Sequence, residues 1–105
     1  MDITNNSGGP IVINRLVAYW VKSPQSQKLD QLFLNGVSIW NTSDPDWPSD
    51  IPAEGGGNWP GAASERTIPD VTTQAFVIQF SNDLQPSGYE VHIVFDIGCQ
   101  AVGTK

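Results

Sequence analysis

The stretch YEVHIVFDI, residues 89–97, decides the fold of this chain. Every second residue in it is aliphatic or aromatic, and three of the four residues between them are polar. An alternation with a period of two predicts a β-strand with one face against a core and the other largely in water. We therefore expect the following side chains to point inward: Tyr89, Val91, Ile93, Phe95 and Ile97.

The same period returns upstream. Residues 73–81 alternate in the same way, with Phe76, Ile78 and Phe80 on one face. Asn35-Gly36 separates two apolar runs at 28–34 and 37–40, and it favours a type I′ hairpin because both residues tolerate a positive φ. Eight Pro and ten Gly interrupt the chain, and no segment keeps the apolar spacing of an amphipathic helix over three turns.

The N-terminal part predicts two further strands. Residues 2–5 form a short opening strand, which is a candidate sheet edge open to partner strands. Along residues 11–21 the apolar parity changes between Ile13 and Leu16, and a β-bulge near Asn14-Arg15 would let both groups face one core. A brief strand is expected at 66–68.

About seven short strands without crossover helices predict an all-β fold, an antiparallel β-sandwich, with a small closed barrel as the alternative. The length of 105 residues fits one domain spanning 1–105. Residues 41–64 hold no period, so we expect a long irregular loop that packs Trp47, Ile51 and Trp59 down over one end or edge of the sandwich.

Composition narrows the classes of partner. The net charge is −6 and the five Lys and Arg residues are scattered, whereas nucleic acids and acidic membranes require clustered basic residues. Only 15% of the residues are charged, so neutral polar side chains build most of the surface, as is common in secreted proteins. The longest apolar run, 16–21, is too short to span a bilayer, and no signal peptide is visible. We expect an exported domain at the cell surface or outside the cell.

Side chains suited to catalysis are few. His92 falls mid-strand on the water-facing parity, no Gly-x-Ser-x-Gly turn is present, and no pair of carboxylates stands out for glycoside hydrolysis. Cys99 has no partner within the chain, so we expect a buried thiol or a bond to a partner outside these residues. The sequence therefore predicts neither an enzyme nor a bound cofactor.

One group of acidic residues is a candidate metal site. Asp44, Asp46 and Asp50 lie within seven residues, and Glu54 follows. Closely spaced carboxylates in a loop suit Ca²⁺, which takes six to eight oxygen ligands. Acidic residues beside Pro are also ordinary turn formers, so both readings stay open.

Three tryptophans have two possible roles. Trp40, Trp47 and Trp59, if exposed in a row, would stack on sugar rings and form a carbohydrate-binding face. Large aromatic side chains also close the open end of a small sandwich and bury most of their area there. Two N-glycosylation sequons, Asn5-Asn6-Ser7 and Asn41-Thr42-Ser43, are expected by chance in a chain so rich in Asn and Ser.

Several short sequence segments resemble those of a known family. The chain resembles the extracellular β-rich domain of bacterial pilin-like (prepilin-type) proteins. The sequence segments that carry the resemblance are Ile3–Gly8, Pro10–Asn14, Leu34–Gly36, Ile39-Trp40 and Phe95–Cys99. The resemblance implies an immunoglobulin-like sandwich and an exported, surface-exposed domain that works by contact. The leader and hydrophobic helix of that family are not found here, so filament assembly through such a helix is not implied.

Together these observations favour a non-catalytic structural or adhesive module of a pilin-like or cell-surface protein. Its expected partners are other protein subunits or a surface ligand. The alternative is a carbohydrate-binding module that uses Trp40, Trp47 and Trp59.

Overall fold

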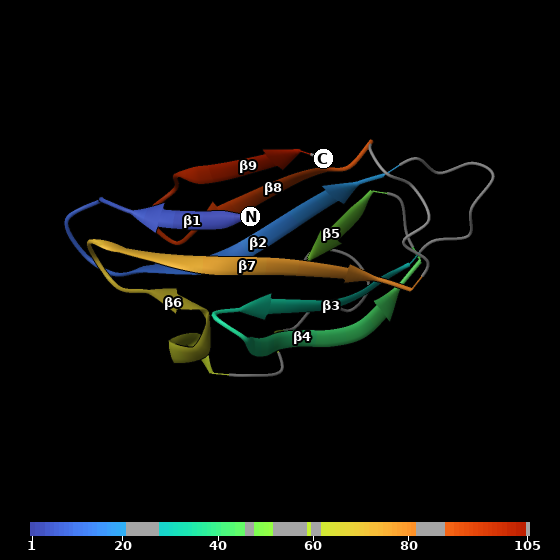
Figure 1. Ribbon diagram of the computed structural model, residues 1–105, viewed down its shortest axis with the longest axis horizontal. Helices are drawn as coiled ribbons and strands as arrows, with labels where there is room; N and C mark the ends of the chain where they lie inside the picture. The colour runs from blue at the N-terminus through green and yellow to red at the C-terminus, as the bar shows by residue number, and fades with distance from the viewer. Residues whose placement is uncertain (21–27, 46–47, 52–58, 60–61, 82–87, 105) are drawn as a thin grey trace.

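A computed structural model describes residues 1–20, 28–45, 48–51, 59, 62–81 and 88–104 of the chain. Within these residues the chain forms nine β-strands and one short 3₁₀ helix. The strands make two antiparallel sheets that pack face to face (Figure 1). This confirms the predicted all-β sandwich. The strands form two separate sheets, so the closed-barrel alternative does not hold.

The first sheet has four strands in the order β1-β7-β3-β4. Its strands are β1 (Asp2–Asn5), β7 (Thr72–Phe80), β3 (Leu29–Leu34) and β4 (Val37–Asp44). The opening strand β1 lies at one edge of this sheet, as the sequence predicted.

The second sheet runs in the order β5-β2-β8-β9. Its strands are β5 (Ser49–Ile51), β2 (Ile11–Tyr19), β8 (Glu90–Phe95) and β9 (Gln100–Thr104). A fifth strand, β6 (Thr67–Ile68), pairs with the beginning of β2 and follows the 3₁₀ helix η1 (Ala63–Arg66).

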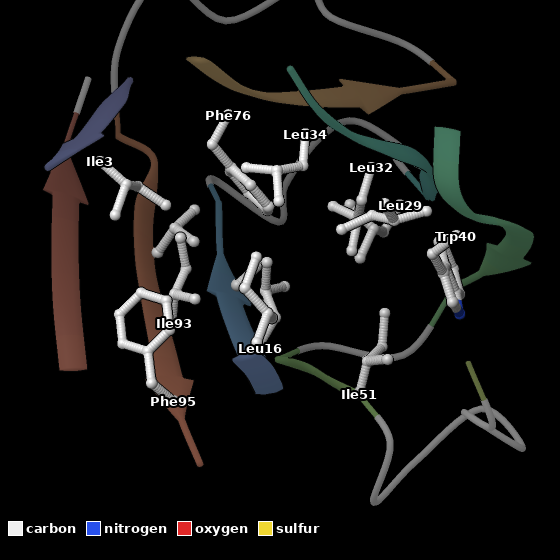
Figure 2. Packing of buried hydrophobic residues seen from close by; sticks show 14 of the residues in the cluster. Ile3, Leu16, Leu29, Leu32, Leu34, Trp40, Ile51, Phe76, Ile93 and Phe95 are labelled. Atoms are coloured by element: carbon white, nitrogen blue, oxygen red, sulfur yellow. The ribbon is translucent and has the colours of Figure 1, made fainter. Parts of the chain in front are cut away.

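The core fills the space between the two sheets, and Figure 2 shows side chains from both sheets meeting there. The predicted inward parity of the last strand is confirmed for Tyr89, Val91, Ile93 and Phe95, which are all buried. Alternate residues of the other strands also face the core, except at β-bulges such as the one in β4, where the neighbours Ile39 and Trp40 are both buried. The core includes Ile3, Ile11, Ile13, Leu16, Ala18, Leu29, Leu32, Leu34, Ile39, Trp40, Ile51, Ile68 and Phe76.

The hairpin between β3 and β4 has the predicted turn. Asn35 has a φ of 51° and Gly36 a φ of 79°, as a type I′ turn requires at both central positions. Beyond this turn β4 continues to Asp44, four residues past the end that the sequence predicted. Residues 41–64 are therefore less irregular than expected, because β5 and the first two residues of η1 also fall within them.

The bulge in β2 lies where the change in the parity of its apolar residues predicted it. The register between β2 and β8 shifts between Ile13 and Arg15, so that Asn14 is the extra residue. As a result Ile13 and Leu16 are both buried although an even number of residues separates them.

The C-terminal end of the last predicted strand differs from the expectation. β8 stops at Phe95, and a tight turn follows in which Gly98, with a φ of 89°, donates its N–H to the Phe95 carbonyl. Ile97 in this turn is 55% exposed, and Cys99 is exposed too, so neither is the core residue that was expected. The turn reverses the chain into β9, a strand that the sequence did not predict.

Candidate contact surfaces

Of the four candidate calcium ligands, the structure describes Asp44 and Asp50. Asp44 is fully buried at the end of β4, in the first sheet. Asp50 lies on β5, in the second sheet, and accepts a hydrogen bond of 2.7 Å from Arg15 Nε with Oδ1 and another from the same guanidinium with Oδ2. Asp46 and Glu54 lie outside the described residues, so the calcium site stays a prediction.

The two candidate tryptophans that the structure describes, Trp40 and Trp59, do not form an exposed row. Trp40 is only 1% exposed and belongs to the core, so its ring faces are closed to a sugar in this fold. Trp59 packs against the core, donates its Nε1–H to the Asn14 carbonyl at 3.3 Å, and has the Arg66 guanidinium over its ring at 5.0 Å. Trp47 lies outside the described residues. Trp40 is therefore part of the core, and Trp59 packs beside it.

The Arg66 side chain contacts both Trp59 and the backbone of β2. Its Nε donates to the Ile13 carbonyl at 3.1 Å while its guanidinium covers Trp59. Partial burial lowers the pKa of Arg66 because a charged group loses hydration there. The cation–π contact occupies a ring face that a sugar would need.

His92 lies at the centre of the outer face of the second sheet. It is flanked by Val17 on β2 and Val102 on β9, which are its cross-strand neighbours. The Tyr19 ring meets the imidazole edge-on, with centroids 6.0 Å apart and an interplanar angle of 80°. Glu90 Oε2 lies 3.5 Å from His92 Nε2, in a pair that carries charge on both sides only when the imidazole is protonated. The neighbourhood of His92 is therefore mostly apolar and aromatic.

We call this surface the outer patch and define it by five residues on β2, β8 and β9: Val17, Tyr19, His92, Val94 and Val102. Val102 is 52% exposed, and the others are partly exposed although they point away from the core. On the β5 side the ion pair between Arg15 and Asp50 borders the patch. An apolar centre with a polar rim is the arrangement found in many protein–protein interfaces.

A second feature lies at the open side of the sandwich, between β7 and β9. An apolar groove with a volume of about 250 Å³ runs there, and we call it the edge groove. Its floor is formed by residues of β7 and β8 and the residue before β8, namely Phe76, Ile78, Phe80, Tyr89 and Val91, and its walls include Met1, Val77, Gly103 and Thr104. The volume lies just below the usual range of small-molecule pockets.

The edge groove lies next to the pairing of β1 with the beginning of β7. β1 pairs with Thr72–Ala75 at the beginning of β7, and Met1 and Phe76 exchange two backbone hydrogen bonds of 2.8 and 2.7 Å. Figure 1 shows β1 alongside only the first half of β7. Gly103 on β9 leaves room for the Met1 thioether, since a Cβ there would lie 2.6 Å from its sulfur.

Sequence reasoning did not find either surface. The sequence predicts that the outward residues of β8 face water, but that β9 would add Val102 to them could not be read from its sequence. The edge groove brings Met1 together with β7 and β9, which lie more than 70 residues away in the chain. The alternation in 73–81 did place Ile78 and Phe80 inward, which was the available signal.

Comparison of the chain with protein-family models, with curated proteins and with solved structures finds no match in any of the three. Within the described residues, His, Cys, Asp and Glu side chains do not gather in groups of three or more that could hold a metal ion. The same residues contain no helix of sufficient length and hydrophobicity to cross a membrane.

Proposed function

We propose that this protein is a non-catalytic extracellular module, of the pilin-like or cell-surface kind, which works by contact with other protein subunits or with a surface. The outer patch carries this proposal. Its centre combines valines with Tyr19 and His92 on the outer face of the second sheet, and tyrosine is among the residues that contribute most to protein interfaces. The ion pair of Arg15 with Asp50 supplies a polar border.

A paired substitution tests the role of the outer patch. Val102→Asp places a charge within the patch at a position that is 52% exposed in β9, so the fold should lose about 1 kcal/mol, the span of β-propensity between such residues. Val71→Asp is the matched control, because Val71 is 77% exposed on a turn before β7. Its φ of 55° suits Asp better than a β-branched residue.

The assay measures adhesion of beads coated with the purified domain to intact cells that produce it. We expect Val102→Asp to weaken adhesion about tenfold, as the loss of a contact of ~1.4 kcal/mol does, and Val71→Asp to leave it unchanged. Equal adhesion of both variants and the original protein would refute the role of the patch. Antibody labelling of intact producing cells tests the location, and labelling only after permeabilisation would contradict an extracellular module.

A further inference from the structure

The side chains on the outer face of the second sheet form three rows across its strands. The strands lie side by side in the order β5-β2-β8-β9, which Figure 1 shows. Residues that lie opposite each other in an antiparallel pair share one face of the sheet, so the register of the strands fixes the rows. The first row is Tyr19, Glu90 and Thr104, the second is Asp50, Val17, His92 and Val102, and the third is Arg15, Val94 and Gln100.

Two exposed charges of opposite sign lie at opposite corners of the two central strands. Arg15 is in the third row on β2, and Glu90 is in the first row on β8. The Arg15 side chain is 49% exposed and the Glu90 side chain 50% exposed. Asp50, which forms the ion pair with Arg15, is only 15% exposed. The face therefore presents one positive corner and one negative corner on either side of the outer patch.

A two-fold rotation exchanges these two corners. Arg15 lies two residues before Val17, and Glu90 lies two residues before His92, the partner of Val17 in the register. Because β2 and β8 are antiparallel, the two charges lie at equal distances on opposite sides of the Val17–His92 pair. An axis in the plane of the face that crosses the strands obliquely between Val17 and His92 therefore relates one position to the other.

This symmetry allows the face to pair with itself. When two copies meet face to face around that axis, Arg15 of each copy lies opposite Glu90 of the other, and two ion pairs form at once. An interface in which one surface patch meets the same patch of a second copy is isologous, the usual form in homodimers. Val17, His92 and Val102 of the middle row then lie in the centre of the contact, where an interface is least polar.

We propose that the outer patch, with Arg15 and Glu90 at its corners, binds a second copy of this chain in a two-fold symmetric contact. This inference rests on the proposed contact function and names its partner. A second copy is complementary in charge because it carries both members of the ion pair at positions that the rotation exchanges. A partner surface with a single sign of charge would attract one corner and repel the other.

The size of the face sets the expected strength of the contact. At the usual spacings of strands and of residues along a strand, the three rows cover roughly 400 Å² on each copy. Stable complexes bury about 800 Å² on each partner, and smaller interfaces belong to transient contacts. We therefore expect a dimer with a dissociation constant in the micromolar range.

The test exchanges the charges at the two corners and measures association by analytical ultracentrifugation. Arg15→Glu alone, or Glu90→Arg alone, sets like charges opposite each other twice in a dimer of identical copies. When the two variants are mixed, each contact again joins a carboxylate and a guanidinium, and the double variant that carries both changes restores the same pairs. Both single variants keep a net negative charge, since each changes the net charge of −6 by two, so a general attraction between them does not explain recovery.

The matched control makes the same kind of exchange away from this face. Lys28 lies directly before β3, and Glu65 lies on η1, and both are exposed. Lys28→Glu and Glu65→Arg, alone and mixed, change the net charge by the same amounts as the test variants. Far-UV circular dichroism of each variant checks the fold, and recovery in the mixture separates a lost ion pair from a damaged fold, which mixing does not repair.

The original protein should show a monomer–dimer equilibrium between about 10 μM and about 1 mM. Each single variant of the corners should raise the dissociation constant at least about tenfold, and the mixture and the double variant should return it to within about threefold of the original. The control variants should leave it unchanged. A protein that stays monomeric at about 1 mM, single variants that dimerise like the original, or a mixture without recovery would overturn the proposal. Association beyond the dimer would overturn it too, because a two-fold contact closes.

The results separate this inference from the proposed function. If the original protein stays monomeric but Val102→Asp weakens adhesion, the second copy is the wrong partner and the contact function of the outer patch stands. If the charge exchange restores the dimer but Val102→Asp leaves adhesion unchanged, the two-fold contact stands and the role of the patch in adhesion is wrong.

Discussion

Replacement of Asn5 by Ala should destabilise the protein more than any other change of a polar side chain in the N-terminal strand. Asn5 is 1% exposed, and its Nδ2 donates to the carbonyls of Gly9 at 2.8 Å and Ile68 at 2.9 Å. Its Oδ1 accepts from Ser7 N–H at 3.0 Å and from Ser7 Oγ at 2.7 Å. One amide group thus connects the end of β1 with its following turn and with β6.

The magnitude follows from the burial of these partners. In Asn5→Ala the Ile68 carbonyl, which lies in a buried bond, loses its donor at about 1–3 kcal/mol. The bonds to Gly9 and Ser7 are partly exposed, so water replaces them at about 0.5–1 kcal/mol each. With one such bond to Gly9 and two from Ser7, we expect a total loss of about 2.5–6 kcal/mol, which corresponds to a Tm lower by about 10–24 °C for a domain of this size.

Urea unfolding followed by far-UV circular dichroism measures this loss. Asn41→Ala is the control, because Asn41 also begins a sequon but is exposed on β4, and its replacement should change stability by less than about 0.5 kcal/mol. A loss below about 1 kcal/mol for Asn5→Ala, or equal losses for the two variants, would refute the role assigned to the Asn5 amide. The burial of Asn5 also predicts that the first sequon stays unmodified in the folded protein, which mass spectrometry of protein from a glycosylating host would show.

Two further predictions concern the core and the tryptophans. Phe95→Ala should lower the free energy of unfolding, measured in urea, by about 3–5 kcal/mol because Phe95 is buried in the core. Glu90 is half-exposed on the other face of the same strand, so Glu90→Ala should change this free energy by no more than roughly 0.5 kcal/mol. Equal losses would show that the inward parity is misassigned. Tryptophan emission should not shift when a panel of glycans is titrated in, since Trp40 is buried and Arg66 covers Trp59; a saturable shift would instead support the carbohydrate-binding alternative.

Local patterns were sufficient for the fold class. The alternation in 89–95 and 73–80 placed the inward residues of β8 and β7, because side chains on any strand change face at each residue. Asn35-Gly36 set the β3–β4 turn, since the conformation needed there depends only on those two residues. The parity change before Leu16 located the bulge for the same reason.

Local patterns failed where another segment supplied the stabilisation. β9 has Ala101 and Gly103 on its inner side and little β-propensity, and it becomes a strand because β8 offers it an open edge. Asp44 and Asp50 are close in sequence but lie on strands of different sheets, and only the pairing of the strands decides this.

The sequence by itself determined that this chain forms β-strands around an aliphatic and aromatic core. The period of two and the turn residues are sufficient for this because each depends only on residues a few positions apart. Only the tertiary structure decided which surfaces are left for contact. The edge groove arises because Met1 and strands β7, β8 and β9 pack together around it. The outer patch arises because β9 sets Val102 beside His92. Both depend on pairings between strands, and no local pattern specifies where one strand ends against another.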